Sequence, residues 1–153
     1  MASDSKTTGR PLGPSGEAVR SNIVRIREAK MMPVTGLSER LETLGRPIPP
    51  LGLRRIEAGT RRVDVDDLVA IAIALGVSPA SLLMPEVSSI AHDDLVSVTG
   101  WHKPITATVV WGWLTSARPL VRGTLGSFID HALPQWDRDR WSTKIVGADG
   151  DDQ

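Results

Sequence analysis

Apolar residues recur at helical spacing through the first half of the chain. The pattern predicts five helices, at Gly16–Ala29, Val34–Leu44, Pro50–Ala58, Val65–Leu75 and Pro79 to about Leu83. In the first of them, Val19, Ile23 and Ile26 fall on one face, which we expect to be buried. Short helices in close succession, without a strand signal, indicate a compact all-α unit over residues 16–85.

The sequence also indicates where the helices end and which apolar residues face the core. Asp64 and Ser78 are natural N-caps, while Gly45, Gly59 and Gly76 suit helix C-termini. The stripes that should face the core are Leu37, Leu41 and Leu44 in the second helix, Leu53 and Ile56 in the third, and Val65, Leu68, Ile71, Ala72 and Leu75 in the fourth.

The second half of the chain is less regular. We expect a short strand within Asp94–Gly100, either a helix from Thr106 or a strand within Ile105–Thr115, and a helix at Leu125–Leu133. The last has Leu125, Phe128, Ile129 and Ala132 at helical spacing. The predicted organisation is a flexible arm (1–15), the helical domain (16–85), a small, mostly helical C-terminal association region (86–141) and a disordered acidic tail (142–153).

The charge of the 153-residue chain is zero overall but unevenly distributed. Residues 1–62 carry 12 basic and 6 acidic side chains, a charge of +6, and residues 63–153 carry 6 and 12, a charge of −6. All five tryptophans lie in the acidic part. A basic module joined to an acidic one suggests that the first half meets a polyanion.

Several function classes are disfavoured by composition. There is no Cys, which excludes disulfides, thiol catalysis and Cys-based metal sites. The three histidines, His92, His102 and His131, do not form a helical ligand pair, and no catalytic constellation, metal site or cofactor motif is recognisable. No apolar run reaches bilayer length and the N-terminus does not look like a signal peptide, so we expect a cytoplasmic protein without membrane contact.

Two motifs indicate the function. LRRIEAG at residues 53–59 is followed by IAIALGVS at residues 71–78, with REAK at 27–30 and LSERL at 37–41 upstream. In this order and separation they resemble the XRE family of lambda-repressor/Cro-like helix-turn-helix proteins, especially its phage and actinobacterial members. The resemblance covers about residues 16–85. It implies a five-helix, lambda-repressor-like domain that binds double-stranded DNA.

The resemblance also implies roles for single positions. The third helix would enter the major groove, with Pro50, Leu51, Arg54 and Arg55 facing base edges and flanking phosphates. We expect Arg55 to contact a base and Arg54 a phosphate, or the reverse. Phosphate contacts are further implied for Thr35, Arg46, Thr60, Arg61 and Arg62. Arg27 and Glu57 match a structural ion pair of the family.

The chain departs from the family pattern at the starts of two helices. Pro33 and Pro49 stand where a capping Ser, Thr or Asn is usual, and each forgoes about 1 kcal/mol. Pro50 and Leu51 occupy positions where other members place Gln or Asn. Base readout is therefore expected to be sparse, with binding led by phosphates and DNA shape as the alternative.

The tryptophans leave two interpretations of the C-terminal region. Trp111, Trp113, Trp136 and Trp141 alternate with arginines and could stack on single-stranded bases. We favour a small core or a dimer surface, because the surroundings are acidic. The sequence thus predicts a homodimeric DNA-binding transcription regulator, a repressor of phage or mobile-element type. The alternative is an antitoxin or adaptor whose Trp-rich region holds a protein partner.

Overall fold

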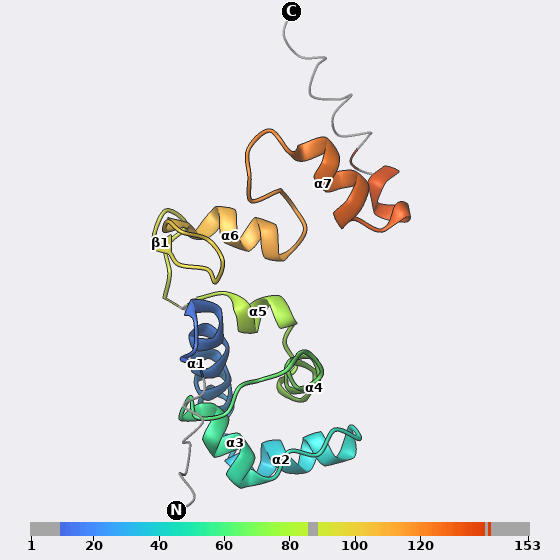
Figure 1. Ribbon diagram of the computed structural model, residues 1–153. Coiled ribbons are helices and arrows are strands. Elements are labelled where there is room, and N and C mark those ends of the chain that lie inside the picture. The colour runs from blue at the N-terminus through green and yellow to red at the C-terminus, as the bar shows by residue number, and fades with distance from the viewer. Residues whose placement is uncertain (1–9, 86–88, 140, 142–153) are drawn as a thin grey trace, which may run out of the picture.

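The computed structural model describes residues 10–85, 89–139 and 141 (Figure 1). Five helices open the chain: α1 (Pro14–Ala29), α2 (Val34–Thr43), α3 (Pro50–Glu57), α4 (Val65–Leu75) and α5 (Pro79–Leu83). The predicted mostly helical fold is confirmed, and these bounds agree with the predicted ones to within two residues. The parts of the predicted arm and tail at residues 1–9 and 142–153 lie outside the described residues.

The five helices share one apolar core. Its fully buried side chains include Ile23 of α1, Leu37 of α2, Leu53 of α3 and Ile71 of α4. Each belongs to a stripe that the helical spacing predicts, because burying that stripe drives the packing of an amphipathic helix. The core therefore fixes which face of each helix is left for solvent.

Two predicted core positions are wrong. Val65 is 76% exposed, and Leu44 is also exposed. α4 instead turns Asp67, Ile71 and Leu75 inward, at successive i, i+4 positions. A buried aspartate was not expected from the pattern of apolar residues, since burial of a charge requires partners that helical spacing does not reveal.

The helix ends follow the local signals. Asp64 Oδ1 accepts a hydrogen bond from the Asp67 amide at 2.7 Å, and Gly76 ends α4 in the left-handed region at φ +69°. Gly45 adopts φ +75° after α2. α2 and α3 begin after Pro33 and Pro49 without a side-chain cap, as predicted.

The chain beyond α5 forms a small two-stranded sheet and further helices. β1 (Leu95–Val96) pairs antiparallel with β2 (Ile105–Thr106). The strand expected within Asp94–Gly100 is thus only two residues long. Ile105–Thr115 contains both predicted alternatives, because its first two residues form β2 and Thr106 is the N-cap of α6 (Ala107–Leu114).

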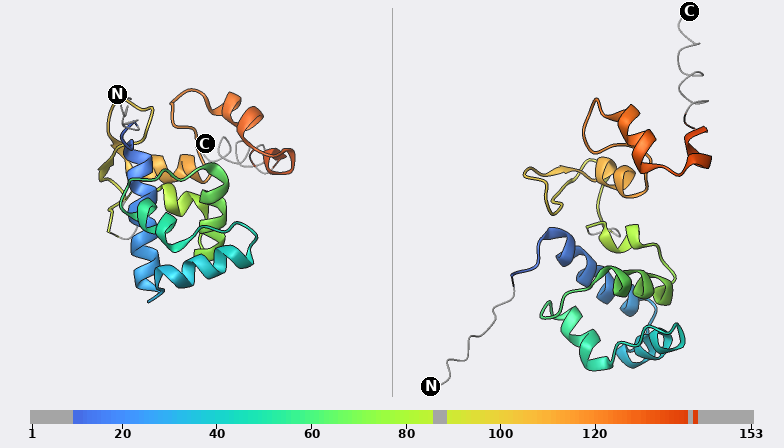
Figure 2. Two further views of the ribbon diagram at one scale, coloured as in Figure 1. Left: turned by 60° about the horizontal axis from the view of Figure 1, so that its bottom comes forward. Right: turned by 45° about the vertical axis from the view of Figure 1, so that its right-hand side comes forward.

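A second apolar cluster lies in this C-terminal part. It is built from Met84, Val96, Val98, Ala107 and Val110, with Trp101 and Trp113 packed against it. No residue of α7 (Leu125–Ala132) is buried. Figure 1 and the right-hand view of Figure 2 place α7 at the end of the molecule opposite α2 and α3.

Hydrogen bonds join α1 both to α5 and to the C-terminal part across long sequence separations. The buried Asn22 Nδ2 of α1 donates to the carbonyls of Leu82 and Met84, at 3.0 and 2.7 Å. Ser15 and Thr99 form a reciprocal pair, in which each hydroxyl accepts from the other residue's amide at 3.1 Å. Thr99 therefore caps α1, which begins at Pro14, and the predicted flexible arm over residues 1–15 extends too far.

Candidate nucleic-acid interface

One face of α3 is cationic and open to solvent. Leu53 and Ile56 are fully buried, which leaves Arg54 and Arg55 on the outside. No hydrogen bond or ion pair holds either guanidinium within residues 10–85, 89–139 and 141. Leu51 is 60% exposed on the same helix. A short helix that presents two unengaged arginines and an apolar side chain can contact both phosphates and base edges.

The predicted positions around α3 differ in exposure and in their partners. Pro50, at the start of the helix, is only partly exposed, whereas Thr35 and Thr60 are exposed. The Thr60 hydroxyl donates to the Arg55 carbonyl at 3.2 Å, which ties the residue after α3 to its last turn. Arg62 is exposed and its Nη2 donates to the carbonyls of Arg10 and Pro11.

Arg27 and Glu57 come together as a bidentate ion pair. Arg27 Nε and Nη2 donate to the two carboxylate oxygens of Glu57 at 2.7 and 3.1 Å. The side chains are only 12% and 14% exposed. Arg27 Nη1 also donates to the Met32 carbonyl at 2.9 Å. The hydrogen bond to Glu57 raises the pKa of Arg27, so this group, which anchors the end of α3 to α1, stays charged.

Arg46 and Arg61 meet at a residue that the sequence analysis missed. Asp67 is 2% exposed; its Oδ1 accepts from Arg46 Nε at 2.8 Å and its Oδ2 from Arg61 Nη2 at 2.9 Å. Arg46 also pairs with Asp64 at 3.1 Å. The hydrogen bond to Asp67 raises the pKa of Arg46. The available signal in the sequence is three aspartates, at 64, 66 and 67, close to Arg61 and Arg62.

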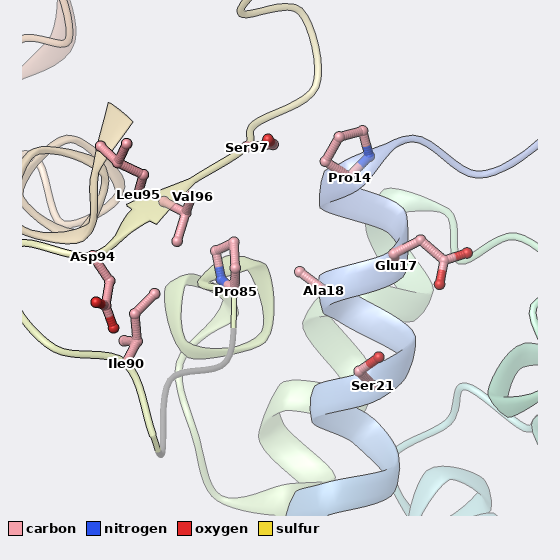
Figure 3. A pocket seen from close by; sticks show the side chains of 10 residues that line it. All are labelled: Pro14, Glu17, Ala18, Ser21, Pro85, Ile90, Asp94, Leu95, Val96 and Ser97. Carbon is pink, nitrogen blue, oxygen red and sulfur yellow. The ribbon is translucent and has the colours of Figure 1, made fainter. Parts of the chain in front are cut away.

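A solvent-open groove of about 470 Å³ lies elsewhere, between α1 and β1 (Figure 3). Its two carboxylates are engaged locally. Glu17 pairs with Arg20 at 2.6 Å, and Asp94 accepts from the Ala91 amide at 2.8 Å. Within the described ranges, no three His, Asp or Glu side chains are placed to hold a metal ion.

Comparison with known proteins finds one family match, within the helical part of the chain. Residues 23–82 match a family model described as Helix-turn-helix, a span that runs from within α1 to within α5 and contains α2 and α3. Neither the curated proteins nor the solved structures include a significant match. No helix in the described part of the chain is long and apolar enough to span a membrane.

Proposed function

We propose that this protein is a DNA-binding transcription regulator that acts as a repressor. Residues 23–82, which match a helix-turn-helix family model, support this proposal. The protein binds a specific double-stranded operator and blocks access of polymerase or of another regulator. A phage or mobile-element promoter is the setting that the resemblance of the motifs favours.

The observation that carries this proposal is the pair of unengaged arginines on α3. Arg55 contacts a base edge and Arg54 a phosphate, because the guanidinium fork matches guanine O6 and N7 or two phosphate oxygens. Leu51 offers apolar contact to a thymine methyl group. Pro50, partly exposed at the start of α3, lies beside Leu51.

Phosphate contacts flank this helix and set its register on the duplex. Thr35 at the start of α2 is exposed and supplies a hydroxyl, and the exposed Thr60 after α3 would exchange its bond to the Arg55 carbonyl for one to phosphate. Arg62 retains its full charge for a phosphate, because its hydrogen-bond partners are neutral backbone carbonyls. If one domain makes about five phosphate contacts, log K falls with log salt at a slope near −4 to −5.

Two copies are needed to read a pseudo-palindromic operator. Their α3 helices would lie in successive major grooves, about 34 Å apart. The apolar face of α7, given by Leu125, Phe128 and Ile129, has no buried residue in the single chain, and it lies at the end opposite α3 (Figure 1). Pairing of two copies through α7 would leave α3 of each copy uncovered.

The deciding experiment is selection of bound duplexes from a random pool, followed by affinity measurements on the selected and scrambled sequences. We expect Arg55→Ala to lose about 1–3 kcal/mol on the selected duplex and to relax the preference at one base pair. Arg122→Ala, at an exposed arginine outside α3, is the matched control and should bind as wild type does. An Arg55→Ala loss that is equal on both duplexes argues against base readout by this residue.

A second candidate is an interaction module, such as an antitoxin or adaptor. It is favoured by the same uncovered face of α7 together with the exposed Trp136. In this case a protein partner would bind stoichiometrically through the C-terminal region, while no duplex from the pool would be retained.

A further inference from the structure

A single carboxylate connects the chain on both sides of α3. Arg46 lies in the turn before α3 and Arg61 lies in the loop after it. Both guanidiniums donate to the carboxylate of Asp67, one to each oxygen. Asp67 is itself fixed in α4, where its backbone amide donates to Asp64 Oδ1. The two ends of α3 are thus tied to one rigid point of another helix.

The same interaction reaches α3 directly. The Nη1 atom of Arg61 lies only 2.6 Å from the place where a Cβ at Gly52 would be. Gly52 is in the interior of α3, where glycine costs about 1 kcal/mol relative to alanine. A glycine at this position leaves room for the Arg61 side chain to cross the helix on its way to Asp67.

Charge distinguishes this cluster from the exposed face of α3. Arg46 and Arg61 are surrounded by Asp64, Asp66 and Asp67, so three carboxylates balance two guanidiniums. The pair has no net positive charge to offer a phosphate. Arg54 and Arg55, by contrast, have no carboxylate partner among the described residues. Buried Asp67 also depends on both arginines, since an unpaired charge in the interior is strongly unfavourable.

We propose that Asp67 is a positioning residue for the DNA-reading helix, and that Arg46 and Arg61 act in this clamp instead of contacting phosphates. This inference rests on the proposed DNA-binding function. It revises the expectation that the motif resemblance suggested for these two arginines. The clamp sets the angle at which α3 leaves the core, and therefore which base edges Arg55 meets.

The test counts phosphate contacts through the salt dependence of binding to the selected duplex. Replacement of a phosphate-contacting residue reduces the slope of log K against log salt by about 1. We expect Arg54→Gln to show this reduction. Arg46→Gln and Arg61→Gln should keep the wild-type slope while the ratio of selected to scrambled affinity falls about tenfold. A slope reduced by about 1 in each of these two variants would overturn the proposal.

Asp67→Asn separates positioning from general loss of structure. The variant keeps the size of the side chain but releases the arginines from their counter-charge. Binding to the selected duplex should weaken about tenfold, while binding to the scrambled duplex stays the same or tightens. A partly unfolded protein would lose affinity for both duplexes alike, and that result would count against the clamp.

Gly52→Ala tests the same point without removing a charge. A Cβ at Gly52 displaces the flexible end of Arg61 and presses on Ile48 Cγ2 at 3.1 Å, so duplex preference should fall as in Asp67→Asn. Gly36→Ala in α2 is the matched control, because its Cβ has only ordinary contacts, the nearest at 3.4 Å, and it should leave preference unchanged. If Gly52→Ala and Gly36→Ala prefer the selected over the scrambled duplex to the same degree, the proposal is contradicted. A wild-type chain that retains no duplex at all would instead overturn the DNA-binding function, and this inference with it.

Discussion

The five-helix bundle and the chain beyond it bury apolar side chains in different ways. In the bundle, α1 to α4 each contribute fully buried side chains to one continuous cluster. Beyond α5 the second cluster is smaller, and α7 contributes no buried residue. The core of the bundle therefore holds α3 in place. The C-terminal part buries less of its apolar surface within one chain and leaves apolar surface for association.

The largest expected effect separates the two cores. Leu37→Ala removes a fully buried side chain from the bundle and should lower its free energy of unfolding by about 2–5 kcal/mol. The matched change Val110→Ala in the second cluster removes less buried area and should cost about 2 kcal/mol there. Urea unfolding with residue-resolved hydrogen exchange measures both. If Val110→Ala destabilises α2 and α3 as much as Leu37→Ala does, the two clusters are one cooperative unit.

The next effect concerns the ion pair that anchors α3 to α1. Glu57→Ala leaves Arg27 largely buried without its carboxylate, which should cost about 2–4 kcal/mol, somewhat less than for a fully buried pair. The double variant Arg27→Met with Glu57→Leu should recover most of the loss, because apolar side chains replace both charges. The denaturant midpoints of the wild type, Glu57→Ala and the double variant measure these differences in stability. A double variant no more stable than Glu57→Ala would mean that the charges themselves hold the helices together.

Association through α7 gives a smaller effect. Phe128→Lys places a charge on the apolar face of α7 and should convert a dimer into monomers, with about a tenfold loss of operator affinity, as the second binding event is no longer intramolecular. Ser127→Lys adds the same charge at an exposed neighbouring position and serves as the control. Light scattering reports the oligomeric state, and duplex titration reports the operator affinity. If wild type is monomeric at all working concentrations, α7 does not pair two copies.

The parts of this structure that sequence predicted are those whose causes are local. α4 begins and ends where Asp64 and Gly76 indicate, because a cap and a left-handed glycine act within one turn. The exposed placement of Arg54 and Arg55 followed from the burial of Leu53 between helices. Capping residues and the periodicity of apolar residues were sufficient for these features.

The parts that were missed depend on contacts between distant segments. Apolar spacing predicts Val65 in the core, but Val65 is exposed and Asp67 is buried instead. Burial of the Asp67 charge depends on its ion pairs with Arg46 and Arg61, and the approach of these side chains depends on the tertiary fold. The two-residue strands and the cap of α1 by Thr99, 84 residues away from Ser15, are likewise beyond any local pattern.

The smallest effect tests the joint between the two regions. Thr99→Ala removes the hydroxyl that accepts from the Ser15 amide, and should cost about 1 kcal/mol, as for loss of an N-cap. Thr99→Ser keeps that hydroxyl and should retain most of the stability. Hydrogen exchange at the Ser15 amide is the measurement, since protection there reports the cap itself. Equal protection in the alanine and serine variants would show that the Thr99 hydroxyl does not hold the first turn of α1.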